Sequence, residues 1–90
     1  MAVKGFRNRY ITFRIDGELE RREMIKHLNR IGRNIGVRLN LTVFEGNMGI
    51  VRVEHKEQKA AIDGMNSYTG LKIRTVKTSG TIKKAKSYLV

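Results

Sequence analysis

Few side chains in the sequence are of the types that enzymes use for acid–base, nucleophilic or metal chemistry. The two histidines, His27 and His55, have no spacing that joins either of them to a pair of carboxylates. Glu18, Glu20 and Glu23 cluster where a helix is expected to begin, and the helix macrodipole accounts for them there. The chain has no cysteine, which excludes disulfides, a thiolate nucleophile and cysteine-ligated zinc or iron–sulfur sites. We therefore expect no catalytic residue, no metal and no cofactor on the protein itself.

The charged side chains favour binding as the chemistry of this protein. The 90 residues include 19 Lys or Arg against 8 Asp or Glu, which gives a formal net charge of +11. Residues 1–15, 24–44 and 64–90 carry basic side chains and no acidic one. Like charges gathered in this way repel one another in a compact chain, so a polyanionic partner is expected. We expect nucleic acid rather than a membrane surface, because no basic amphipathic helix carries large aromatic residues on its apolar face.

Hydrophobic periodicity predicts the elements that must position these charges. Alternation of apolar and polar residues predicts strands at residues 9–15, 37–44, 49–54 and 71–77. Apolar residues at helical spacing predict helices at residues 18–34 and 56–68, and a short terminal helix capped by Ser79 or Thr81. The chain is expected to form a single α+β domain over residues 1–90. Its βαββαβ order is typical of a ferredoxin-like, RNA-recognition-like sandwich, a four-stranded antiparallel sheet with two helices on one face.

The alternation also assigns side chains to the two faces of the predicted sheet. One set, which includes Ile11 and Val51, is expected to face the helices. The opposite face is expected to stay open and to carry Tyr10, Arg14, Arg38, Phe44, Arg52, Lys72 and Arg74. RNA-recognition domains stack bases on aromatic residues of the two central strands, but Tyr10 is the only aromatic residue expected there, so phosphate or protein contacts are favoured. Phe44 and Ile50, as outward apolar residues, are the candidates for a protein interface.

The last acid-free segment ends in the run SGTIKKAKSYL, residues 79–89. Its Ser-Gly-Thr start leaves backbone N–H groups free at the beginning of a helix, where a phosphate can bind. Lys83, Lys84 and Lys86 add mobile positive charge beside those groups. The run on its own is equally compatible with a capped helix whose lysines are only solvated.

Three segments along the chain carry a resemblance to a known family: RNRYITFRI at residues 7–15, GIVRVEHK at residues 49–56, and SGTIKKAKSYL at residues 79–89. Together they resemble ribonuclease P protein component 2, the small protein subunit of archaeal and eukaryotic ribonuclease P. The resemblance implies a ferredoxin-like fold in a non-catalytic subunit of an enzyme that removes the 5′ leader from precursor tRNA. The RNA subunit would perform the hydrolysis and hold the Mg²⁺ ions, and the protein would bind and stabilise that RNA.

The resemblance also implies partners and contact residues. The partners would be ribonuclease P RNA, precursor tRNA indirectly, and the TIM-barrel-like component 3, with which the subunit can form a heterotetramer. Relatives carry extra residues between the first strand and the first helix, where this chain has only residues 16–20. With the sheet-face and terminal-helix side chains added, the RNA-binding candidates are Arg7, Arg9, Tyr10, Arg14, Arg38, Arg52, Lys72, Arg74, Ser79, Gly80, Thr81, Lys83, Lys84 and Lys86.

Several alternatives stay open at this point. Another structured-RNA-binding protein, of ribosomal type, would have the same charge. A small-ligand regulatory domain of the same element order would place its pocket at the Asp16–Gly17 turn, although the net charge of +11 argues against it. An acylphosphatase-like enzyme would need a glycine-rich phosphate loop, and the run DGELERR at residues 16–22 lacks that pattern. A cytoplasmic location without a membrane partner is expected, because no apolar segment is long enough to span a bilayer.

Overall fold

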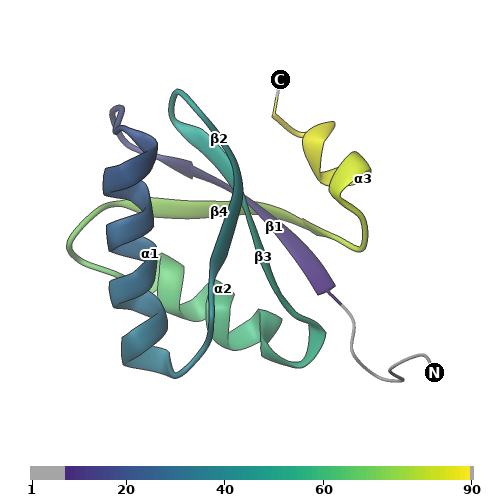
Figure 1. Ribbon diagram of the computed structural model, residues 1–90, viewed down its shortest axis with the longest axis horizontal. Helices are drawn as coiled ribbons and strands as arrows, with labels where there is room; N and C mark the ends of the chain where they lie inside the picture. The colour runs from purple at the N-terminus through teal and green to yellow at the C-terminus, as the bar shows by residue number, and fades with distance from the viewer. Residues whose placement is uncertain (1–7, 90) are drawn as a thin grey trace.

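The structure is a computed structural model that describes residues 8–89. Its elements are β1 (Asn8–Ile15), α1 (Arg21–Ile35), β2 (Asn40–Glu45), β3 (Met48–Glu54), the 3₁₀ turn η1 (His55–Glu57), α2 (Gln58–Ser67), β4 (Ile73–Ser79) and α3 (Ile82–Lys86). This order confirms the predicted βαββαβ arrangement with a short terminal helix (Figure 1). None of the helices within residues 8–89 is long and apolar enough to cross a membrane.

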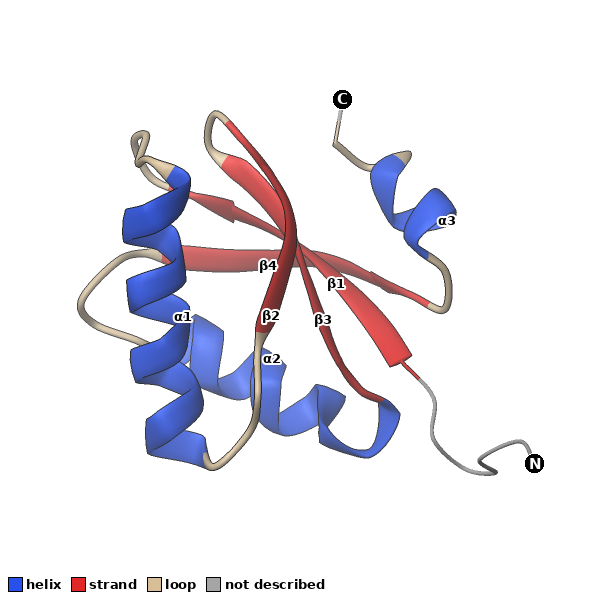
Figure 2. Ribbon diagram, viewed as in Figure 1, coloured by secondary structure: helices blue, strands red, loops and turns tan. Residues whose placement is uncertain are grey.

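The four strands form one antiparallel sheet in the order β2-β3-β1-β4. Helix α2 contacts β1, β3 and β4, while α1 contacts α2 and β2, so both helices cover the same face of the sheet (Figure 2). This is the α+β, ferredoxin-like sandwich expected from the sequence. The core between the layers is formed by apolar residues from every layer, among them Ile11, Phe13, Ile15, Met24, Leu28, Ile31, Val51, Val53, Ala61 and Met65.

Helix α1 forms where the apolar period is strongest. Met24, Leu28 and Ile31 are buried along one side of the helix, which is the stripe that an amphipathic helix presents to a core. Gly36 ends the helix in the left-handed conformation, with φ of 72°, and its N–H donates to the carbonyl of Gly32. The opposite side of α1 is left to solvent.

Strand β2 changes faces in its middle, which the sequence pattern does not reveal. A register shift against β3 lies between Leu41 and Val43, and it rotates the later side chains to the opposite face. Phe44 therefore pairs with Gly49 and stacks on Phe13 above the core, with ring centroids 6.4 Å apart and planes 21° apart. The expectation that Phe44 points outward, away from the helices, is wrong for this reason.

Helix α3 covers the sheet face that was expected to stay open. It contacts β1 and β4, and the Thr12 hydroxyl donates to the carbonyl of Ala85 over 3.3 Å. Thr12, Ile50 and Ala85 each have 0% of their surface exposed. Ile50 does point away from α1 and α2 as predicted, but its expected exposure to a partner is wrong, because it is fully buried beside Thr12, the residue that α3 contacts.

The packing of two aromatic rings above Gly49 gives the first prediction. A Cβ atom at Gly49 would lie 2.7 Å from Cζ of Phe13 and 2.9 Å from Cδ1 of Phe44. Gly49→Ala is therefore expected to lower the free energy of unfolding by about 1–3 kcal/mol through overpacking. Urea unfolding measures this change, and a loss below about 0.5 kcal/mol, typical of a surface substitution, would contradict the packing described.

The position of α3 gives a second prediction. Ala85→Glu places a carboxylate at a fully buried position, so α3 is expected to separate from the sheet and expose Ile50. A lower melting temperature and increased binding of a hydrophobic dye would report this change. Lys83→Glu, at an exposed position of the same helix, is the matched control and should change neither. Equal behaviour of the two variants would contradict the burial of the sheet face by α3.

Candidate nucleic-acid interface

Three of the predicted basic residues meet at the free edge of β4. Arg14 and Arg74 are direct cross-strand neighbours in the β1–β4 pairing, and both side chains are exposed. Together with Lys72 they line a surface hollow of about 840 Å³. Asp16 is the one acidic residue in the lining, so three basic side chains face a single carboxylate. Like charges directly opposite each other destabilise a sheet, so this arrangement favours an anion placed between them. We refer to the hollow lined by Arg14, Lys72 and Arg74 as the β4-edge hollow.

The wall of the β4-edge hollow is fixed by hydrogen bonds between α2 and β4. The backbone N–H of Thr75 donates to Oδ1 of Asn66 over 3.1 Å, and Nδ2 of Asn66 donates to Oγ1 of Thr75 over 3.1 Å. Both residues line the hollow. The amide of Asn66 thus satisfies part of the exposed strand edge and holds the end of α2 beside the basic side chains.

The predicted Ser79–Gly80–Thr81 turn connects β4 to α3. Thr81 is the cap of α3, because its hydroxyl accepts a hydrogen bond from the N–H of Lys84 over 3.2 Å. Ser79 is buried in β4, and among the described residues its hydroxyl oxygen has no hydrogen-bond partner. A Cβ atom on Gly80 would lie 3.3 Å from a terminal nitrogen of Arg9, so that guanidinium approaches the turn. One of the N–H groups that were expected to be free for a phosphate, that of Lys84, is thus already bonded to Thr81.

Arg9 and the two histidines are engaged within the protein. Nε of Arg9 donates to Nδ1 of His55 over 3.0 Å, which ties β1 to the 3₁₀ turn η1. His27 Nδ1 lies 2.8 Å from the hydroxyl of Tyr68, and the two rings pack edge to face. Within residues 8–89, no three His, Asp or Glu side chains are placed so that they could hold a metal ion.

The other candidates are spread over the remaining surface. Arg38 and Arg52 line a smaller hollow of about 310 Å³ that also contains Glu54 and Glu57, so part of their charge is balanced locally. Tyr10 is half-buried and pairs with Arg52 across β1 and β3. The exposed lysines of α3, Lys83, Lys84 and Lys86, extend from the covered side of the sheet. Arg7 lies outside the described residues.

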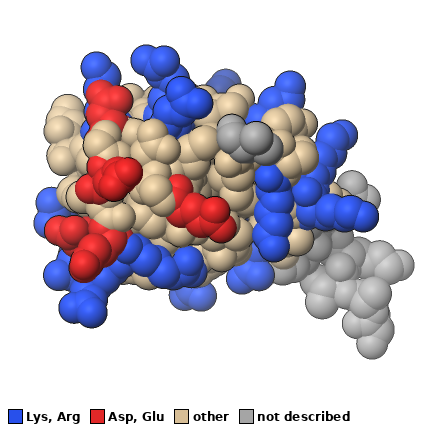
Figure 3. All heavy atoms as spheres, turned by 90° about the horizontal axis from the view of Figure 1, so that it is seen from above, with Lys and Arg blue, Asp and Glu red and all other residues tan. Residues whose placement is uncertain are grey.

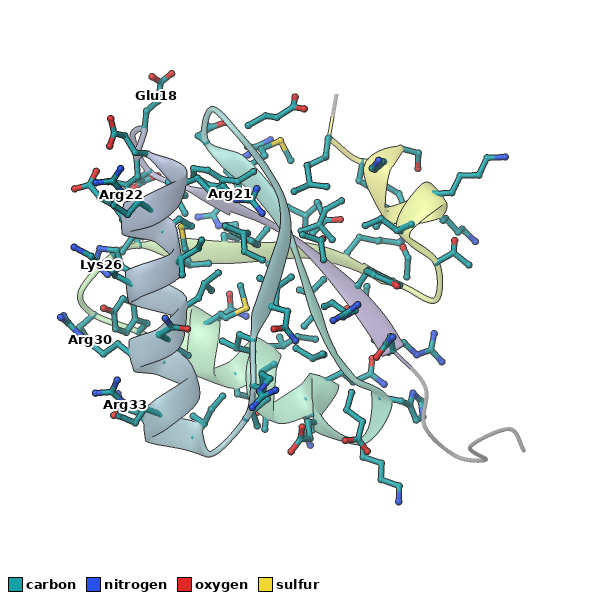
Figure 4. The ribbon with its side chains drawn as sticks, in the orientation of Figure 1. Glu18, Arg21, Arg22, Lys26, Arg30 and Arg33 are labelled. Carbon is teal, nitrogen blue, oxygen red and sulfur yellow. The ribbon has the colours of Figure 1, made fainter. Side chains whose placement is uncertain are left out.

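The outer face of α1 carries a basic group that the sequence analysis did not include among its sites. Arg22, Lys26, Arg30 and Arg33 lie along the helix and point away from the body of the protein (Figure 4). We call these four residues the α1 stripe. Their spacing of four, four and three residues places them on one face of a helix, and this spacing was the available signal. Lys26, Arg30 and Arg33 belong to the acid-free segment 24–44 noted in the sequence.

Charges of the two signs are unevenly distributed over the surface. In the view of Figure 3, Asp and Glu side chains lie at the left end and near the centre of the visible face, where those at the left end are next to Lys and Arg side chains. The right part of this face carries Lys and Arg side chains without acidic ones, so positive potential is strongest there.

Comparison with known proteins gives a likeness in fold. No protein-family model matches the sequence, and no curated protein matches it with significance. A chain in the cryo-EM structure of yeast ribonuclease MRP superposes on this protein with a TM-score of 0.70. The match covers 99% of this chain and 88% of that chain, with 12% sequence identity. At this identity, the likeness establishes that the two chains share a fold.

The like-charge pair gives a prediction that does not depend on any ligand. Arg74→Gln removes the repulsion with Arg14, so the free energy of unfolding is expected to rise at low ionic strength by about 0.2–1 kcal/mol. The gain should shrink as salt is added, because exposed charges are screened over about 10 Å at 0.1 M. Urea unfolding at low and high salt measures both effects. A loss of stability at low salt would contradict the unbalanced pair.

Proposed function

We propose that this protein is an RNA-binding subunit of a ribonucleoprotein of the ribonuclease P and ribonuclease MRP kind. The observation that carries the proposal is the convergence of Arg14, Lys72 and Arg74 at one hollow, with two arginines directly opposite each other in the sheet. A protein does not gain stability from that pairing, whereas a phosphate between the guanidinium groups would be held by both of them.

The chemistry of such a site is neutralisation of the RNA backbone. Arginine contacts phosphate through a planar fork of N–H donors, and Lys72 adds a mobile point charge at the rim of the hollow. Each phosphate neutralised releases condensed counterions, which supplies affinity without reading sequence. The lysines of α3, Lys83, Lys84 and Lys86, would add contacts of the same kind on the other side of the sheet.

Base stacking on the sheet is not part of the proposal. Single-stranded RNA is commonly held by aromatic side chains on an open sheet face. Here α3 lies over that face, Thr12 and Ile50 are fully buried, and Tyr10 is half-buried. The protein would therefore bind folded RNA through its backbone, which is the role of a supporting subunit.

The finer assignment is to the small subunit of ribonuclease P. It is supported by the sequence resemblance at residues 7–15, 49–56 and 79–89, and by the fold shared with a chain of yeast ribonuclease MRP. In this assignment the RNA holds Mg²⁺ and cleaves the 5′ leader of precursor tRNA, and the protein contributes no catalytic group. A larger protein subunit, the TIM-barrel-like component 3, would be its neighbour in the particle.

Isolation of the protein from its own cells tests this assignment. A tagged copy is expected to recover ribonuclease P or MRP RNA as the most enriched species when the bound RNA is sequenced. Ribosomal RNA as the only enriched species would contradict the assignment and favour a ribosomal role. Recovery of no RNA would contradict RNA binding altogether.

A matched pair of variants tests the site in the same experiment. Arg14→Gln combined with Arg74→Gln is expected to reduce the recovered RNA severalfold, because two phosphate contacts are lost. Lys56→Gln combined with Lys59→Gln removes the same charge from exposed positions in η1 and α2 and should have little effect. Equal losses for the two pairs would mean that only the net charge matters, and this result would remove the β4-edge hollow from the site.

A further inference from the structure

The α1 stripe is more basic than the stability of the helix requires. Glu18 and Glu20 precede α1 and Glu23 lies in its first turn, but from residue 24 to its end the helix contains no acidic residue. Arg22 lies in the first turn, where the helix macrodipole disfavours a positive charge. Arg22, Lys26 and Arg30 follow at steps of four residues, and like charges at that spacing destabilise a helix. Arg21 has a structural contact, because its Nη2 donates to the carbonyl of Leu41 over 3.1 Å. The four side chains of the stripe point to solvent instead (Figure 4).

The stripe is continuous with the β4-edge hollow. Arg30 lines a second hollow, of about 360 Å³, between α1 and the segment after α2. Ser67, Tyr68 and Thr69 line both this hollow and the β4-edge hollow. The neutral residues 67–69 thus join Arg30 of the α1 stripe to the basic side chains at the edge of β4. Along the helix it spans about 16 Å from Arg22 to Arg33, at 1.5 Å per residue.

The composition of this surface indicates the class of partner. A protein interface needs a buried apolar centre, but the only large hydrophobic side chain that is strongly exposed within residues 8–89 is Val76, in β4. Interfaces with nucleic acid are instead polar and strongly positive. Binding of single strands relies on exposed aromatic rings, and Tyr68 beside the stripe is half-buried and held by His27.

We propose that the α1 stripe is a contact surface for the phosphate backbone of double-stranded RNA, which extends the β4-edge hollow onto the outer face of α1. The proposal rests on the RNA-binding function above and adds the surface and the form of RNA that it fits. An RNA helix would lie against Arg22, Lys26, Arg30 and Arg33 and be recognised by shape and charge, since none of these contacts requires access to base edges.

A salt titration with one matched control tests the proposal. The probe is a two-turn RNA duplex of mixed sequence, and the variants are Lys26→Gln with Arg30→Gln, and Lys56→Gln with Lys59→Gln as the control. Each phosphate contact contributes about 0.7–0.9 to the slope of log K against log salt, so loss of two contacts should reduce the slope by about 1.4–1.8. The affinity at 0.1 M salt should fall by about tenfold or more. The control should retain the wild-type slope.

Each other result overturns the proposal in an identifiable way. An unchanged slope for Lys26→Gln with Arg30→Gln, or an equal reduction in the control, would remove α1 from the site. An equal loss of affinity for a single strand of the same sequence would contradict the duplex as the occupant. Wild-type protein that binds no RNA would overturn the proposed function itself, whereas intact wild-type binding with an unaffected variant overturns only this inference.

Folding does not confound the comparison. Gln is about as good a helix former as Lys and Arg, and all four substituted side chains are exposed. The variants are therefore expected to match the wild-type melting temperature, or to exceed it slightly where like-charge pairs along α1 are removed. Thermal unfolding of the free proteins verifies this before the titration.

Discussion

Burial of β1 on both of its faces is the constraint on which the rest of the structure depends. Ile11, Thr12 and Phe13 are consecutive and each is completely buried, so side chains on both sides of the central strand are covered. α1 and α2 cover one side and α3 covers the other. Because the middle of the sheet is enclosed, most of the basic side chains lie around it, on the outer face of α1, at the free edge of β4 and on α3. Arg38 and Arg52 lie apart from these groups, in a hollow that also contains Glu54 and Glu57. The same enclosure that gives a small domain its core thus determines where a polyanion can bind.

This arrangement favours contact with the RNA backbone over readout of bases. An open sheet with two aromatic residues would have offered a stacking platform, but Phe44 belongs to the core and α3 lies above the face that carries Tyr10. Exposed basic side chains around the sheet can contact the backbone phosphates of folded RNA without reaching the base edges in a groove. In the ribonucleoprotein that we propose, such a subunit would act by neutralising phosphates and fixing the position of RNA helices.

The sequence predicts the element order and the helix-facing core well, because both follow from strong periodicity in β1, α1 and β3. The prediction of which side chains face the core fails where the strand alternation is interrupted. The shift in β2 reverses Phe44, and no single residue type in NLTVFE marks where the extra residue falls. The cover of Ile50 by α3 depends on the tertiary placement of a five-residue helix, which local pattern does not specify. At the site, Arg14, Lys72 and Arg74 were identified individually, but their meeting at one hollow depends on strand register. The spacing of the α1 stripe is visible in the sequence, but that this face of the helix stays uncovered depends on the tertiary packing of α1.

The most direct test of the central claim, that RNA binds the peripheral basic surfaces and not the sheet face, is an NMR titration of the protein with the RNA duplex. Amide shifts are expected to change along α1, in residues 66–75 and in α3, while amides of the buried β1 and β3 centres stay in place. Amide shift changes confined to β1 and β3 around Tyr10, together with α3 amides that move to the shifts of an unfolded segment, would contradict the account.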